Sequence, residues 1–155
     1  MASSPAYRLQ PNAWSCGPTA LYNAFQAMGV KCGLFNLCNM TACTKQLGTS
    51  EAGLRMGALY YGVDFLTSQC YTAEFFKAGV RVRCPMLIAV DRDSDGPYAH
   101  WIAVLKATKR HVWIADSSRP GPAERRLTWL QFMDRVSTVV NGEIKYTYHP
   151  LVKRK

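Results

Sequence analysis

The sequence predicts an α+β domain in which an N-terminal helical half packs against a C-terminal antiparallel sheet. The first half carries apolar residues at spacings of three and four, bounded by helix-capping residues, as in the segment that begins at Cys16. The second half has short runs of β-branched and aromatic residues between turns, as in residues 100–116. Because helices come first and strands follow, we expect the Cys16 helix to pack on the sheet, with a cleft between the halves.

The clearest element is a helix that begins at Cys16. Pro18 suits the first helical turn, where its missing N–H costs nothing, and Gly29 suits the helix end. The apolar residues at helical spacing are Ala20, Leu21, Ala24, Phe25 and Met28. We therefore expect Cys16 at the N-terminus of a buried helix, where unpaired N–H groups and the helix dipole stabilise a thiolate.

The remaining elements are predicted from capping residues, turns and periodicity. In the first half they are an apolar-periodic stretch at 34–40, a helix at about 51–61 capped by Ser50, an extended segment at 63–66 and a short helix from Thr72 to Gly79. In the second half they are a strand within 80–90 interrupted by Pro85, a hairpin of strands 100–105 and 112–116, a helix from 128 to about 139 and a last strand at 144–152. Thr128 and Gln131 form a capping box for the last helix, with Leu127 and Phe132 as its hydrophobic staple.

Length and composition favour a single domain over the whole chain, 1–155, with a core at about 7–152 and a short basic tail at 153–155. Apolar residues make up 48% of the sequence, which argues against disorder, and no apolar run is long enough for a membrane span. Residues 1–5 have neither the basic nor the apolar region of a signal peptide, so we expect a cytoplasmic protein.

The six cysteines are then most simply reduced thiols, and a secreted disulfide framework is the weaker alternative. Cys32, Cys38 and Cys43 lack the spacing of a zinc site, so we expect no metal there. The acidic segment 91–96 begins like a calcium loop, but Ile102 stands where the bidentate Glu is required. We interpret that segment as a solvated loop, with weak calcium binding as the alternative.

The formal net charge of +9 favours acidic partners, nucleic acid or an acidic substrate. The Lys and Arg residues are scattered, however, with dense clusters only at 125–126 and in the tail 153–155. No Gly-rich or aromatic-interleaved RNA-binding motif is present. Specific nucleic-acid recognition therefore stays open but is not favoured.

A thiol nucleophile needs a base, and the predicted hairpin supplies one. If its turn is centred near Thr108, residues whose numbers sum to about 216 lie opposite each other, and His100 and Asp116 meet that condition on one face. Directly opposed residues have Cβ atoms roughly 4.5–5.5 Å apart. We expect Asp116 to accept a hydrogen bond from His100 and to leave the other ring nitrogen aimed at Cys16, as in acyl-transfer enzymes.

Oxyanion donors are expected beside this group. Gln10 lies six residues before Cys16, so its side-chain amide and the backbone N–H of Cys16 are candidates to hold an oxyanion. The other histidines, His111 and His149, are expected to be structural or exposed. Three aromatic residues flank the proposed centre and either line a substrate groove or pack the domain: Trp14, Tyr98 and Trp101.

The order Gln…Cys…His…Asp, the step from Gln10 to Cys16 and the Cys-Gly-Pro-Thr-Ala helix start resemble papain-like cysteine peptidases. More closely, they resemble the bacteriocin-processing peptidases that cut after double-glycine leaders, and their stand-alone relatives. The Gly-Thr-Ser element at 48–50 and the strand from His100, with an acid 16 residues on, are similar to that family too. The likeness spans roughly residues 9–118.

The resemblance implies a papain-like fold and a cysteine peptidase that acts on protein or peptide substrates without a cofactor. It implies Cys16 as nucleophile, His100 as general base and acid, Asp116 as the orienter of His100, and Gln10 as an oxyanion donor. A Ser-Ser pair follows the acid where the family usually has Pro, and no transporter domain is attached. Specificity for double-glycine leaders and coupling to export therefore do not carry over.

Two other readings of the same residues stay open. The acyl-enzyme can pass its acyl group to an amine, or form from a side-chain amide, which would make the protein an acyltransferase or deamidase. Alternatively, the chain is a basic binding module that presents a papain-like groove without turnover.

Overall fold

The computed structural model describes residues 6–90, 100–118, 122–136, 138–140 and 142–155. Its helices are α1 (Cys16–Met28), α2 (Leu34–Met40), α3 (Glu51–Tyr60), α4 (Ala73–Arg83) and α5 (Trp129–Val136). Its strands are β1 (Val63–Phe65), β2 (Ser68–Cys70), β3 (Met86–Val90), β4 (His100–Ala107), β5 (His111–Ala115), β6 (Glu124–Thr128), β7 (Thr138–Val140) and β8 (Glu143–Lys153). None of these described helices has the length and apolar character of a membrane span.

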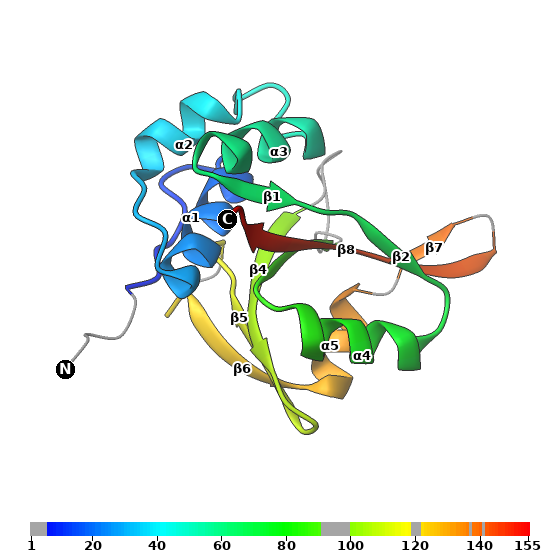
Figure 1. Ribbon diagram of the computed structural model, residues 1–155. Coiled ribbons are helices and arrows are strands. Elements are labelled where there is room, and N and C mark those ends of the chain that lie inside the picture. The colour runs from blue at the N-terminus through cyan, green and yellow to red at the C-terminus, as the bar shows by residue number, and fades with distance from the viewer. Residues whose placement is uncertain (1–5, 91–99, 119–121, 137, 141) are drawn as a thin grey trace.

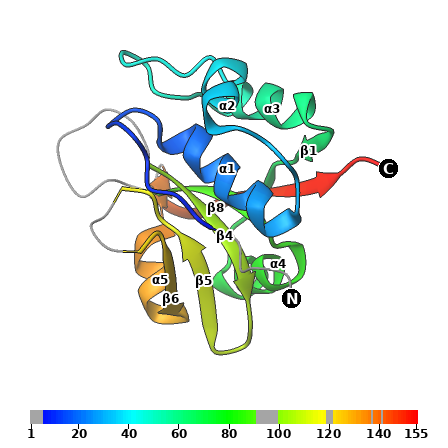
Figure 2. The same ribbon diagram turned by 90° about the vertical axis from the view of Figure 1, so that its left-hand side faces the viewer.

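The strands form an antiparallel sheet in the order β1-β8-β3-β4-β5-β6, to which β2 and β7 add by pairing with β8 (Figure 1). The long strand β8 can pair with several partners because it extends over 11 residues. Helices α1, α2 and α3 lie on one side of the sheet, and α4 and α5 lie on the other (Figure 2). The predicted α+β class is confirmed.

Each face of the sheet carries its own hydrophobic core. Leu21 and Phe25 of α1 belong to the first, and Phe76 of α4 and Phe132 of α5 belong to the second. Strand β4 contributes to both, because successive side chains of a strand point to opposite faces. Its residues divide into Trp101, Ala103 and Leu105 on the α1 side and Ile102 and Val104 on the α5 side.

Several predicted boundaries are confirmed. Helix α1 begins at Cys16 and ends before Gly29, which adopts the left-handed conformation with φ 71°. Helix α3 begins after Ser50, whose hydroxyl group accepts a hydrogen bond from the N–H of Gly53. The capping box at the start of α5 forms in both directions: Thr128 N donates to Gln131 Oε1 at 2.9 Å, and Gln131 N donates to Thr128 Oγ1 at 3.2 Å.

The prediction that the helix after Thr72 ends at Gly79 is wrong. Helix α4 continues to Arg83, and strand β3 begins only at Met86, after Pro85. Gly79 serves close packing and not termination, since a Cβ at this position would collide with the ring of Tyr148 on β8. The glycine therefore lets α4 lie directly against the sheet.

The second half differs from the prediction in two more places. Strand β6 was not expected, because its sequence Glu-Arg-Arg-Leu-Thr has exposed and half-buried positions but few residues typical of strands. Helix α5 ends at Val136 and not near Val139, and Thr138–Val140 forms strand β7, which pairs with β8. The β-branched residues of that segment favour a strand over a helix.

The register of the β4–β5 hairpin also differs from the predicted one. Near the turn, Ala107 pairs with Val112, so the numbers of paired residues sum to 219. Farther from the turn, on the other side of Leu105, Ala103 pairs with Ala115 and the sum is 218. The irregularity between Val104 and Lys106 shifts the pairing by one residue. Because 218 is even, as the predicted sum of 216 was, His100 and Asp116 still lie on the same face of the hairpin. They are diagonal neighbours, however, and not directly opposed residues.

Candidate active site

Cys16 is the first residue of α1 and is 8% exposed. The preceding Ser15 makes no side-chain cap to the helix, and the first turn holds no acidic residue. Thr19 is bound to the carbonyl oxygen of Ser15 through both its N–H, at 3.1 Å, and its hydroxyl group, at 2.7 Å. The positive end of the helix dipole therefore lies at the thiol without an acidic side chain of the first turn to offset it.

The segment at 48–50 approaches the start of α1 closely. A Cβ at Gly17 would lie 2.7 Å from the Cβ of Thr49, so only glycine permits this approach. The carbonyl oxygen of Thr49 accepts a hydrogen bond from the indole Nε1 of Trp101 at 3.2 Å. This contact ties the segment beside the cysteine to the central strand β4.

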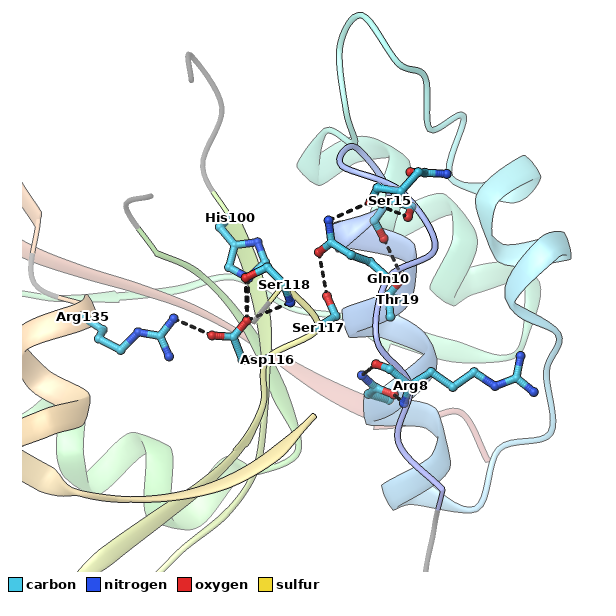
Figure 3. A network of polar contacts seen from close by, with 11 residues as sticks. Arg8, Gln10, Ser15, Thr19, His100, Asp116, Ser117, Ser118 and Arg135 are labelled. Carbon is cyan, nitrogen blue, oxygen red and sulfur yellow. Dashed lines mark hydrogen bonds and ion pairs between the residues drawn. The ribbon is translucent and has the colours of Figure 1, made fainter. Parts of the chain in front are cut away.

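His100 and Asp116 form a buried pair at the ends of β4 and β5. His100 Nε2 lies 2.9 Å from Asp116 Oδ1, and the two side chains are 3% and 0% exposed (Figure 3). The contact predicted from the sequence is therefore present, although the predicted register behind it is wrong.

Asp116 is held by further donors. Its Oδ1 accepts from the N–H of Ser118 at 3.2 Å and from the Ser118 hydroxyl group at 2.9 Å. Its Oδ2 accepts from Nη2 of Arg135 at 2.7 Å. Burial alone would raise the pKa of Asp116, but the hydrogen bonds from His100, Arg135 and Ser118 outweigh it and hold that pKa well below its usual range. Asp116 is thus ionised at neutral pH.

The pKa of His100 is subject to opposing influences. Burial lowers its pKa, but hydrogen bonding to Asp116 and Cys16 and the charges of both groups raise it, and the net pKa lies above the ordinary value. Nε2 of His100 faces Asp116, so the interaction with Cys16 falls to Nδ1. Because the carboxylate fixes the proton on Nε2, Nδ1 is the basic nitrogen of the neutral ring.

Gln10 is held by Ser117, the residue that follows Asp116 after strand β5. Its N–H donates to the carbonyl oxygen of Ser117 at 3.0 Å, and its Oε1 accepts from the hydroxyl group of Ser117 at 2.9 Å (Figure 3). Its Nε2 donates to the carbonyl oxygen of Asn12 at 2.8 Å. Because a carbonyl oxygen only accepts, this contact assigns the amide orientation and leaves the second N–H of Nε2 for another acceptor.

The three aromatic candidates have different surroundings. Trp101 is 7% exposed and lies in the core between α1 and the sheet, so it packs the domain and does not line an open groove. Trp14 is half-buried and lines a pocket of about 410 Å³ between the segment before Cys16 and helix α2, together with Leu34 and Phe35. Tyr98 lies outside the described residues.

The other cysteines differ from Cys16 in position and electrostatics. None of the six forms a disulfide bond. Burial raises the pKa of Cys32 to about 11 and that of Cys84 to about 12. It also raises the pKa values of Cys38, Cys43 and Cys70. At neutral pH these five side chains are therefore protonated thiols.

The remaining histidines lie away from this group. His149 is 2% exposed, and its ring stacks on Phe65 with centroids 4.7 Å apart. Burial is the main cause that lowers the pKa of His149, so the ring is neutral and structural. His111 is half-buried beside Trp113.

Within the described ranges, no three or more His, Cys, Asp or Glu side chains gather in a way that could hold a metal ion. Cys32, Cys38 and Cys43, whose spacing does not fit a zinc site, are partly buried thiols. The acidic segment 91–96 considered for calcium lies outside the described residues.

Sequence reasoning missed three residues of this site. Ser117 and Ser118 could have been suspected, because they replace the Pro that usually follows the acid in the resembling family. Arg135 gave no local signal: it lies 19 residues beyond Asp116, and only the packing of α5 on the sheet brings the two together.

Comparisons with known proteins identify the family and the fold. A model of the peptidase C39 family matches residues 5–140. The peptidase domain of Streptococcus ComA, a bifunctional ABC transporter involved in quorum sensing, is 18% identical with a TM-score of 0.72, and the match covers 97% of this chain and 99% of that one. A double-glycine-motif protease from an AMS/PCAT transporter, solved in complex with a leader peptide, is 13% identical with a TM-score of 0.66, covering 96% and 93%.

A third structure is more distant in sequence. The N-terminal peptidase C39-like domain of a toxin secretion ATP-binding protein from Vibrio parahaemolyticus is 7% identical with a TM-score of 0.61, and the match covers 92% of this chain and 100% of that domain. Among curated proteins, no sequence matches the chain.

The fold and the family match together define a cysteine peptidase of the papain-like type. The chain belongs to the peptidase C39 family. The resemblance to bacteriocin-processing peptidases found in the sequence is thereby confirmed.

Proposed function

We propose that the protein hydrolyses peptide bonds through a Cys16–His100–Asp116 triad and an acyl-enzyme intermediate. One observation carries the proposal: a fully buried His–Asp pair interacts with the thiol at the start of α1. The raised pKa of His100 favours an imidazolium beside a thiolate, which is the reactive state of such a pair.

In the proposed reaction, Nδ1 of His100 takes the proton of the Cys16 thiol. The thiolate sulfur attacks the peptide carbonyl carbon, a C–S bond forms and the electron pair of the C=O bond moves to oxygen. When this intermediate collapses, the C–N bond breaks and His100 gives its proton to the leaving amine. Water, deprotonated by His100, then releases the acyl group from the sulfur and regenerates the thiol.

We propose Gln10 and the backbone amide of Cys16 as the donors to the oxyanion. The fixed orientation of the Gln10 amide supports this role, because one N–H of Nε2 is used by Asn12 and the second remains. A donor fixed before the reaction stabilises developing charge without reorganisation.

The substrate is proposed to be a peptide or an unfolded segment of a protein. One structural relative of similar fold was solved with a leader peptide, which supports peptide binding in this fold. The formal charge of +9 favours acidic peptides through long-range attraction. Trp14, beside the pocket before Cys16, stays a candidate for contact with the substrate.

Digestion of a proteome-derived peptide library, read by mass spectrometry, tests this function. New peptide termini are expected with the wild-type protein and none with Cys16→Ala, while Cys70→Ala, a matched change in a thiol on β2, should keep full activity. Products with an unbroken chain but an altered side-chain mass, or with a transferred acyl group, would instead identify a deamidase or acyltransferase.

A further inference from the structure

The two oxygens of the Asp116 carboxylate have different partners. Oδ1 faces Nε2 of His100 and also accepts from Ser118, whereas Oδ2 accepts from Nη2 of Arg135 at 2.7 Å (Figure 3). The guanidinium reaches the carboxylate from α5, on the side away from α1 (Figure 3). One oxygen is therefore turned toward the imidazole while a cation holds the other.

Arg135 is itself fixed. It lies in the last turn of α5, a helix started by the Thr128–Gln131 capping box and anchored to the core by the buried side chains of Phe132 and Val136. Its side chain is only 20% exposed and that of Asp116 is 0% exposed. Ion pairs on the surface contribute little, but a fully buried carboxylate that loses its cation is left poorly solvated.

We propose that Arg135 is a positioning residue of the peptidase, which sets the plane of the Asp116 carboxylate and through it the orientation of the His100 ring. This inference rests on the proposed function of the triad. Rotation about the terminal torsion of Asp is broad, so a charged donor on the second oxygen restricts the turning of the carboxylate. With Oδ2 held, Oδ1 keeps the proton on Nε2 and leaves Nδ1 basic and directed toward Cys16.

The alternative is that Arg135 merely ties α5 to the sheet. In that case its loss would lower stability but leave the His100 ring and the rate of the chemical step unchanged in the folded protein. A positioning role instead predicts a change in the orientation of the His100 ring and in the rate of the chemical step, without a change in substrate binding.

The test compares Arg135→Met and Arg135→Lys with Arg126→Met, a matched change of an exposed arginine on β6. Nuclear magnetic resonance of ¹⁵N-histidine-labelled protein reports the exchangeable proton on His100 Nε2, which a short hydrogen bond to a carboxylate shifts downfield and protects from exchange. Turnover of a peptide from the library gives kcat and KM, and thermal unfolding reports stability.

We expect Arg135→Met to weaken or remove the His100 Nε2 proton signal and to lower kcat by about 10- to 100-fold with little change in KM, the size of effect seen for groups that orient metal-ligating histidines. Arg135→Lys, which keeps a cation but presents one point charge, should retain the signal and part of the kcat. Arg126→Met should match the wild type in both.

A folded Arg135→Met protein with an unchanged Nε2 proton signal and kcat would overturn the inference. If that variant does not fold, Arg135→Lys decides: a signal and kcat identical to those of wild type under conditions where Arg135→Lys is measurably less stable would assign Arg135 to stability alone. If the wild type cleaves no peptide yet the signal responds to Arg135→Met, the proposed function fails while the positioning of His100 by Arg135 stands.

Discussion

At the scale of single residues, the charge of Asp116 dominates the site. The carboxylate is buried without exposure and ionised, and its bond to His100 at 2.9 Å raises the pKa of that imidazole. In a thiolate–imidazolium pair, activity is lost on the alkaline side as the imidazolium loses its proton. A raised His100 pKa therefore extends activity to pH values above about 6.5, the ordinary pKa of histidine.

Asp116→Asn should move this alkaline limit to lower pH. The amide keeps the shape of the side chain but removes the charge and acceptor that raise the pKa of His100, so the imidazolium is lost earlier as pH rises. We also expect kcat to fall by about 100-fold because the ring is no longer held in one orientation. The pH dependence of kcat/KM for both proteins checks this, and an unchanged or higher alkaline limit in the variant would contradict it.

Gln10→Ala should separate oxyanion stabilisation from thiol reactivity. Loss of the amide donor is expected to lower kcat by about 100- to 1000-fold. Alkylation of Cys16 by iodoacetamide passes through no tetrahedral oxyanion, so its rate should stay close to that of wild type. A parallel loss of both rates would show that Gln10 acts on the cysteine itself and not on the oxyanion.

At the scale of secondary-structure elements, short local signals predicted most boundaries. The capping box at Thr128 and the glycine after α1 depend on neighbours within a few residues, so the sequence contains the whole interaction. The end of α4 could not be predicted in this way. Glycine is a typical residue at a helix end, but Gly79 instead allows close contact with Tyr148, which lies on a strand 69 residues away in sequence.

The hairpin shows the same limit for the site. The pairing of His100 with Asp116 was predicted from a turn centre and the period of a strand, which are local properties. The irregularity near Leu105 shifts the register and depends on how β4 packs on both faces, so it was not predictable from residue spacing. The contact with Arg135 depends on the packing of α5 and was equally outside local reasoning.

Gly79→Ala tests the packing of α4 on the sheet. Alanine would stabilise an exposed helix interior by up to about 1 kcal/mol relative to glycine. Here its Cβ would collide with the buried ring of Tyr148, so we expect a net loss of roughly 1–3 kcal/mol in the free energy of unfolding. Urea unfolding measures this, with Ala78→Gly, one position earlier in α4, as the control for helix propensity. A more stable Gly79→Ala protein would mean that α4 does not contact β8 this closely.

At the scale of the whole molecule, the fold gives Cys16 surroundings that differ from those of the other five cysteines. The helices and the sheet bury Cys32, Cys38, Cys43, Cys70 and Cys84 to the extent that their pKa values all rise. Cys16 is buried too, at 8% exposure, but it lies at a helix N-terminus beside a histidine whose pKa is raised. The proposed triad therefore predicts that Cys16 is the most reactive of the six thiols.

Limiting alkylation with iodoacetamide at pH 6, followed by peptide mapping of all six cysteines, tests this prediction most directly. Cys16 should be labelled first, His100→Ala should abolish this selectivity, and His111→Ala should preserve it. If Cys16 reacts no faster than Cys70 or Cys84, or reacts equally fast without His100, then the thiol is not activated by the histidine and the proposed triad is wrong.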